Sequence, residues 1–351
     1  MRILIVTDAW SPQVNGVVRT LNAVIAELRT KGHDVRTINP EGRPSRPLPL
    51  YREVTLTHTT VATMREEIAA IAPDVIHIAT EGPLGWTARR VCLREGLKFT
   101  TGFHTRFAEY AAARIPLPGV LSLGWEVLRR FHAPSQAVMV PTKSIGAELD
   151  RRRFRNVKIW TRGVDHTLFK PYDRGHLDLP RPIILYAGRL AVEKGIDDFI
   201  ALQVRGTKVL VGDGPERERL QKLAPDAVFL GFRHGEDYAR THAAADVMVF
   251  PSRTDTFGLV MLEAMACGTP VAAYNAPSPL DVVDNGVTGI IADTLEDAVE
   301  RAITLDRKVV EDGSRKFSWK TCADMFESWL VPCGTITPHG GRQELAYALP
   351  R

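Results

Sequence analysis

Two successive series of short apolar runs, each run followed by a helical pattern, constrain the fold of this 351-residue chain more than any other feature. Continuous apolar strands separated by helices are typical of a parallel sheet that is covered on both faces. The first series therefore predicts one α/β domain. Its expected strands cover residues 3–7, 35–38, 75–79, 98–102 and 137–141, and its expected helices cover residues 17–31, 61–71, 84–95 and 121–131.

The same alternation starts again after residue 182 and predicts a second α/β domain. Its expected strands cover residues 183–188, 208–212, 228–230, 247–251, 271–274 and 288–292. Two doubly wound sheets side by side place their ligand crevices at the carboxyl ends of the strands, facing each other. We expect a first domain over 1–168, a polar and proline-rich linker over 169–182, a second domain over 183–312, an amphipathic helix over 313–330 and a mobile tail over 331–351.

Composition excludes several classes of protein. No run of about 18 apolar residues is present, so no membrane-spanning helix is expected, and the first residues lack the pattern of a signal peptide. The four cysteines are scattered without a CxxC pair, which fits a reducing cytoplasm and argues against structural zinc. No metal site is expected.

Charge is unevenly distributed along the chain. Residues 1–166 hold 24 Lys and Arg against 15 Asp and Glu, a net charge of +9, whereas residues 167–351 hold 21 against 26, a net charge of −5. A basic first half indicates an anionic partner, which could be nucleic acid, an anionic lipid surface or an acidic ligand. An ordinary solvated surface explains the charge equally well.

Glycines and cations follow the expected first strand of each domain. Asn15 and Gly16 precede a helix, where a glycine lets the backbone approach a ligand and the helix N-terminus can hold an anion. This segment lacks GxGxxG, the fingerprint of dinucleotide binding, and a plain turn between strand and helix is the alternative. Gly188 and Arg189 end a strand and Lys194 opens a helix, and two such cations can clamp a diphosphate or simply lie on a surface loop.

Two further segments of the second half combine glycines and carboxylates. Gly212 and Gly214 would keep side chains out of a crevice for a base or ribose, although a tight turn would need the same glycines. In residues 250–270, a buried strand leads to Asp255 and then to a helix that carries Glu263. Glu263 can accept hydrogen bonds from vicinal hydroxyls, while a helix-capping Asp and a solvated Glu are the structural alternative. The amides expected to point from this helix N-terminus belong to Phe257, Gly258 and Leu259.

These segments together resemble a known family. GRLAVEKG, VGDGPE, PSRTDTFGLVMLEAMACGTPV and NGVTGI are similar to motifs of the retaining group-1 glycosyltransferases, whose GT-B fold has two Rossmann-like domains and a C-terminal helix that crosses back to the first domain. The resemblance implies that Arg189 and Lys194 bind the donor diphosphate and that Glu263 binds the ribose. It assigns the donor-sugar hydroxyls to Asp255 and to the amides of Phe257, Gly258 and Leu259. The family usually has Glu where this chain has Asp255.

The first half resembles the lipid-directed members of the family. VTDAWSPQVNGVVRT and GFHTRFAEY are similar to segments of diacylglycerol glucuronosyl-, glucosyl- and sulfoquinovosyltransferases and, more distantly, of phosphatidylinositol mannosyltransferases. The resemblance makes His104 the residue beside the transferred sugar and places Asn15 and Gly16 near the donor. It implies retaining, metal-independent transfer without a cofactor, since the nucleotide sugar is a substrate. The expected donors are UDP-glucuronate or UDP-glucose, and the expected acceptor is a lipid such as diacylglycerol.

Other functions remain as alternatives. They include a GDP-mannose-dependent mannosyltransferase acting on a lipid, a soluble enzyme of polysaccharide or disaccharide synthesis, and a sugar epimerase, phosphorylase or inactive binding protein on the same fold. Nucleic-acid binding is disfavoured because no recognition module is present. A peripheral position on the inner face of the cytoplasmic membrane is expected, with contacts from Arg89, Arg90, Arg94, Arg129 and Arg130. Residues 117–131 could dip into the interface or form a core helix. For a uronic donor, Arg19 and Arg106 are candidate carboxylate partners.

Overall fold

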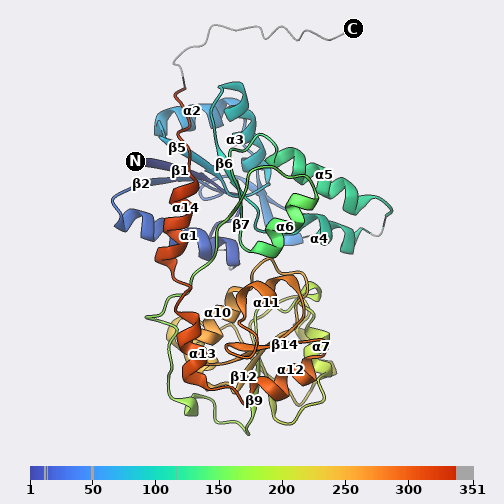
Figure 1. The fold of residues 1–351 in the computed structure, drawn as a ribbon. Coiled ribbons are helices and arrows are strands. Elements are labelled where there is room, and N and C mark those ends of the chain that lie inside the picture. Colours follow the sequence, from blue (N-terminus) through green and yellow to red (C-terminus); the bar gives the residue numbers. More distant parts are fainter. Residues whose placement is uncertain (12, 14, 49–50, 116, 337–351) are drawn as a thin grey trace.

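A computed structural model describes residues 1–11, 13, 15–48, 51–115 and 117–336. It has two α/β domains, one above the other in Figure 1. The first holds a parallel six-stranded sheet in the order β2-β1-β5-β6-β7-β8. Helices α1 (Gly16–Thr30), α2 (Val61–Ile71), α3 (Pro83–Arg94), α4 (Phe107–Arg114), α5 (Val120–His132) and α6 (Lys143–Arg151) connect or cover its strands β1 (Arg2–Val6), β2 (Asp34–Ile38), β5 (Val75–Ile78), β6 (Thr100–Gly102), β7 (Val138–Val140) and β8 (Val157–Ile159).

The second domain repeats this plan with the parallel order β11-β10-β9-β12-β13-β14. In each sheet the direction of winding reverses at one point, between β1 and β5 or between β9 and β12, and ligands of such sheets bind at this point beyond the strand ends. The strands of the second domain are β9 (Ile183–Ala187), β10 (Thr207–Val211), β11 (Val228–Gly231), β12 (Val247–Phe250), β13 (Val271–Tyr274) and β14 (Gly289–Ala292). Its helices are α7 (Ile196–Ala201), α8 (Arg217–Leu223), α9 (Gly235–Ala244), α10 (Leu259–Ala266), α11 (Pro277–Val282) and α12 (Leu295–Ala302).

The predicted fold class is confirmed, and the strands lie where the apolar runs were. Short elements were missed. The antiparallel hairpin of β3 (Ser45–Leu48) and β4 (Tyr51–Thr57) has a proline in its first strand and no clear alternation. Strand β8 has only three residues, and the eight and nine residues of α4 and α6 are too few for a clear helical period.

The predicted single helix over 313–330 is wrong, because the chain breaks it into α13 (Arg307–Ser314) and α14 (Trp319–Trp329). Ser318 is extended, and its hydroxyl accepts a hydrogen bond from the Thr321 amide at 3.1 Å, which caps α14. Helix α14 then runs along the first domain beside α1, as Figure 1 shows in red. Its buried Cys322 and Phe326 join the core of the first sheet, so the expected crossing-back helix is confirmed.

The first residues of the segment expected to be mobile are held on the first domain. Pro332 forms a bridge with Val75, and the Cys333 amide donates to the Asp74 carbonyl at 2.8 Å. Cys333 is buried. That part of the expectation is corrected, while residues 337–351 lie outside the described residues. In the described part of the chain, no helix combines the length and apolar character needed to cross a membrane.

Candidate active site in the interdomain cleft

The two predicted cations lie at the carboxyl end of β9, at the switch point of the second sheet. Arg189 donates to Glu193 at 2.6 Å, and the Lys194 ammonium contacts the Asp255 carboxylate at 2.5 Å. Burial alone would lower the pKa of Lys194, but Asp255, with smaller contributions from Tyr110 and Glu193, offsets it and the pKa lies above its usual value. The structure thus brings Lys194 and Asp255 together from loops 61 residues apart in the chain.

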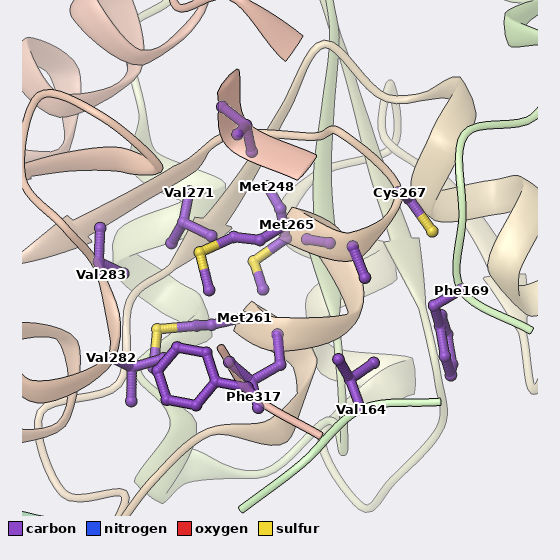
Figure 2. Close-up of a cluster of buried hydrophobic side chains, with 14 of the residues drawn as sticks. Val164, Phe169, Met248, Met261, Met265, Cys267, Val271, Val282, Val283 and Phe317 are labelled. Atoms are coloured by element: carbon purple, nitrogen blue, oxygen red, sulfur yellow. The ribbon is translucent and has the colours of Figure 1, made fainter. Parts of the chain in front are cut away.

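Helix α10 carries Glu263 and is fixed by a buried core. Met261 and Met265 of this helix pack against the cluster that contains Phe317 and Val282, as Figure 2 shows. Gly258 begins the helix with a φ of 83°, and a β-carbon there would lie 2.7 Å from the Phe250 ring. No described side chain caps the start of α10, and the first amides of a helix can bind an anion or a hydroxyl.

Glu263 is only 2% exposed, so it is not a solvated helix residue. One of its carboxylate oxygens binds the Arg19 guanidinium of α1, and the other accepts a hydrogen bond from the Tyr238 hydroxyl of α9 at 3.2 Å. The Glu263 charge raises the pKa of Arg19, and burial together with Glu263 holds the pKa of Tyr238 well above its usual value. The carboxylate of the second domain therefore contacts the first domain directly.

Several contacts join the two domains beside these residues. The Thr256 hydroxyl donates to the His104 carbonyl at 2.7 Å. A β-carbon at Gly16 would lie 3.7 Å from the Leu259 side chain, so the starts of α1 and α10 face each other. The Ser144 amide also donates to Asp281 at 2.8 Å. Predicted residues of both halves, among them Gly16, His104 and Glu263, thus lie where the two domains contact each other.

The His104 ring is held in one tautomer by a residue that sequence reasoning missed. Arg162 donates from Nη2 to Nδ1 of His104 at 3.1 Å, and because a guanidinium only donates, the ring proton must be on Nε2. That Nε2 is buried and has no hydrogen-bond partner among the described residues. Burial and the Arg162 charge hold the pKa of His104 well below its usual value, so the ring is a neutral donor. Burial also lowers the pKa of Arg162 to about 10.

The glycines of the second domain have a packing role. Gly212 has a φ of 127°, and a β-carbon there would lie 1.9 Å from the Gly188 carbonyl oxygen. At Gly214 a β-carbon would lie 2.3 Å from the carbonyl oxygen of Leu190. The two loops could not approach each other with any side chain at these positions. The side chain of Asn15 likewise caps α1 by accepting from the Val17 and Val18 amides, each at 3.0 Å.

The five arginines proposed for membrane contact do not all point to solvent. Arg89 donates to the carbonyls of Arg130 at 2.8 Å and Phe131 at 2.9 Å, so its guanidinium caps the end of α5 and the expectation for Arg89 is corrected. Arg129 is exposed and pairs with Glu126 at 2.7 Å. Arg90, Arg94 and Arg130 are exposed.

The candidate partners of a uronic sugar are engaged by carboxylates. Arg106 contacts Glu109 at 3.3 Å and also binds Glu148, and Arg19 binds Glu263. Sequence reasoning also missed Tyr238, which has no local pattern to reveal it. In the part of the chain that the structure describes, no group of three or more His, Cys, Asp or Glu is placed to hold a metal ion.

Comparison with known proteins agrees with this architecture. Residues 14–168 match the family model described as Glycosyltransferase Family 4, and residues 181–305 match that of Glycosyl transferases group 1. Among solved structures, sucrose-phosphate synthase from Thermosynechococcus elongatus has a TM-score of 0.78 at 21% identity and covers 93% of this chain and 97% of its own. At 21% identity, the likeness to this solved structure concerns the fold alone.

Several relatives match over most of the chain, among them two mannosyltransferases and a sulfoquinovosyl transferase. A GDP-mannose-dependent alpha-mannosyltransferase of Mycolicibacterium smegmatis is 33% identical, covering 97% of this chain and 96% of its own. Sulfoquinovosyl transferase SQD2 of Arabidopsis thaliana is 28% identical, and the match covers 88% of this chain and 68% of that protein. A GDP-mannose-dependent alpha-(1-6)-phosphatidylinositol dimannoside mannosyltransferase of Mycobacterium tuberculosis is 27% identical, and the match covers 99% of this chain and 100% of that protein. With both family models matching and a 33% identical relative aligned along nearly its whole length, this chain belongs to the group-1 glycosyltransferases and is a GT-B glycosyltransferase.

Proposed function

We propose that this enzyme transfers a neutral hexose from a nucleotide sugar, with GDP-mannose the first candidate, to a lipid acceptor at an anionic membrane surface. The observation that carries the proposal is a contact between the domains: Lys194 pairs with Asp255, and the neighbouring Thr256 hydroxyl donates to the His104 carbonyl. Arg189 lies five residues before Lys194, and α10 begins three residues after Thr256. The cations and helix amides of the second domain suit a diphosphate, and the neutral histidine donor of the first domain suits a sugar hydroxyl.

In the proposed reaction, Arg189 and Lys194 bind the donor diphosphate and stabilise the charge that grows on it as the sugar leaves. Glu263 accepts the ribose hydroxyls once Arg19 moves aside. Nε2 of His104 donates to a hydroxyl of the transferred sugar, and Asp255 accepts from another. Attack from the front face, with the departing diphosphate taking the acceptor proton, would retain the configuration without an enzyme nucleophile or a metal ion.

Two observations support a neutral sugar and GDP-mannose over the UDP-glucuronate or UDP-glucose suggested by sequence motifs. Arg106, one of the two candidate partners of a uronic carboxylate, is bound to two carboxylates of the protein. Two of the three relatives named above carry GDP-mannose in their names. UDP-glucose remains the second candidate, supported by the sequence motifs shared with glucosyltransferases.

The lipid acceptor is supported by charge and by a relative. The phosphatidylinositol dimannoside mannosyltransferase of Mycobacterium tuberculosis is named for a lipid acceptor. In this chain, the net charge of +9 in residues 1–166 and the exposed Arg90, Arg94 and Arg130 suit an anionic bilayer surface. Binding driven by these charges should weaken as salt increases.

The test is a radiolabelled-donor assay. GDP-mannose, UDP-glucose and UDP-glucuronate are each offered with diacylglycerol or phosphatidylinositol in anionic vesicles, and the lipid extract is counted. The proposal predicts label in the lipid from GDP-mannose. Label from UDP-glucuronate alone would contradict the neutral donor, and label only in an added soluble sugar would contradict the lipid acceptor.

A further inference from the structure

An open apolar groove of about 330 Å³ lies in the first domain between helices α3, α4 and α5. Eleven residues line it, of which nine are apolar, one is Gly124 and one is Glu81. Helix α5 supplies a lining stripe that includes Val120, Leu123, Val127 and Phe131, spaced by three or four residues so that they share one face. One face of α5 therefore lines the groove along most of the length of the helix.

Helix α5 has more apolar surface than the protein core uses. Its Trp125 and Leu128 are buried against the Phe103 cluster, which is the contact expected of a surface helix. On the groove side, however, Leu123 is 65% exposed, Val127 44% and Phe107 of α4 45%. Contiguous exposed apolar surface of this kind marks a binding site for an apolar ligand, a membrane or a protein.

Arginines flank this groove on the same helix faces. Arg90 follows the lining residue Trp86 by four positions on α3, and Arg130 follows Val127 by three on α5, so each lies one turn beyond a lining residue. Both are exposed. An apolar trough bordered by cations matches a lipid, whose chain is apolar and whose surroundings in the membrane are anionic.

Glu81, the charged residue of the groove lining, is linked through His132 to the strand that precedes His104. Glu81 follows β5, and its carboxylate accepts a hydrogen bond from Nε2 of His132 at 3.1 Å. The other ring nitrogen of His132 contacts the Thr101 hydroxyl of β6 at 2.8 Å. His104 follows this same strand, and the groove residues Phe107 and Ala108 come three and four positions after it.

We infer that this groove binds one acyl chain of the lipid acceptor, with the polar head of the lipid at Glu81 and directed toward His104. The inference rests on the proposed lipid acceptor and adds where its chain lies. The apolar stripe holds the chain out of water, and the flanking arginines face the bilayer from which the chain is drawn. The groove would thereby select acceptors with long chains over short-chain analogues that bear the same hydroxyl.

The test compares two acceptors and two variants of the full-length enzyme. Dioleoylglycerol and dihexanoylglycerol are offered at fixed mole fractions in uncharged detergent micelles, with the donor that labels lipid in the wild type. Val127→Trp fills the groove. Ser122→Trp places the same bulk on an exposed position of α5 outside the groove. We expect Val127→Trp to raise the KM for dioleoylglycerol at least tenfold while the KM for dihexanoylglycerol stays within twofold, and Ser122→Trp to change neither.

A binding measurement covers the case in which Val127→Trp does not fold. Dioleoylglycerol brominated on its chains should quench tryptophan fluorescence, and the Trp86→Phe variant should lose part of that quenching because Trp86 lines the groove. Equal quenching in Trp86→Phe and wild type would overturn the inference.

The outcomes separate the two proposals. If the wild type labels both acceptors and Val127→Trp affects them equally or not at all, the groove is not the acceptor site, although the lipid function stands. If Val127→Trp weakens only the pelleting of the enzyme with anionic vesicles, the groove anchors a bystander lipid, which also overturns the inference. If the wild type labels no lipid with any donor, the proposed function itself fails.

Discussion

Glu263 is a buried carboxylate whose hydrogen-bond partners come from both domains. A charge this buried is tolerated only with partners, and in the absence of a donor Arg19 and Tyr238 supply them. If Glu263 binds the ribose, the nucleotide and Arg19 compete for the same carboxylate. Arg19 then joins the domains when the cleft holds no donor and leaves Glu263 when the donor arrives.

We therefore expect Arg19→Ala to tighten the binding of GDP about three- to tenfold in calorimetric titration, because the nucleotide no longer displaces a guanidinium. The free protein should lose about 1–2 kcal/mol of unfolding free energy, since Glu263 is left with one partner and the Arg19 side chain is partly exposed. Arg29→Ala, on the same helix, serves as the control. A marked loss of GDP affinity in Arg19→Ala would mean that Arg19 contacts the nucleotide itself.

The motifs predicted on which strand ends and helices the candidate site residues lie but did not show how these residues pair. A strand followed by glycine and a helix can be read locally, so the positions of Gly188, Arg189 and Glu263 followed from the sequence. The link between Arg162 and His104 joins segments 58 residues apart, and that between Arg19 and Glu263 joins segments 244 apart. Such contacts depend on how the two sheets are placed, which no local pattern contains.

Long elements were predicted well for the same reason. Helix α2 was expected at 61–71 and has those bounds, because eleven residues give a clear period and Thr60 caps the start. The break between α13 and α14 was missed because the apolar residues continue through it. Ser318 caps α14 through its hydroxyl, and its backbone lies against Gly163, so a local cap and a tertiary contact together fix where the chain turns.

Helix α14 ties the end of the second domain to the first. The Phe326 ring is fully buried between His77 and Trp160, with ring centroids 4.9 Å from each. We expect Phe326→Ala to lower the unfolding free energy of the first domain by about 3–5 kcal/mol in urea denaturation, because a large cavity is left in a packed core. Lys320→Ala, exposed on the same helix, should cost less than about 0.5 kcal/mol. A loss below about 1 kcal/mol in Phe326→Ala would show that α14 is not anchored as described.

Both domains bury neutral histidines, which makes the stability of the enzyme depend on pH. Burial lowers the pKa of His77 in the first domain and of His242 in the second to about 3. Between pH 6.5 and 3 each ring is protonated in the unfolded chain and neutral in the folded one. The unfolded chain then binds more protons, so stability is complete above pH 6.5 and is lost as pH falls through this window.

The change that isolates one of these rings is His242→Phe, since neither ring nitrogen of His242 has a hydrogen-bond partner among the described residues. In urea denaturation between pH 7.5 and 5, the wild type should lose stability below pH 6.5 more steeply than the variant. The slopes should differ by about 1.4 kcal/mol per pH unit for the histidine removed. Parallel curves would contradict a neutral buried His242.

We assign the donor diphosphate to Arg189 and Lys194 of the second domain, and the most direct test of that assignment is kinetic. Turnover is measured for Arg189→Ala, Lys194→Ala and the exposed control Lys222→Ala, each first shown by circular dichroism to be folded, using the donor that the wild type consumes. Since in the proposed reaction each cation stabilises charge on the leaving group, we predict that either site variant loses about 100- to 1000-fold in kcat while Lys222→Ala stays within twofold. A folded Lys194→Ala or Arg189→Ala that retains more than half of the wild-type turnover would contradict the assignment of the cleft as the donor site.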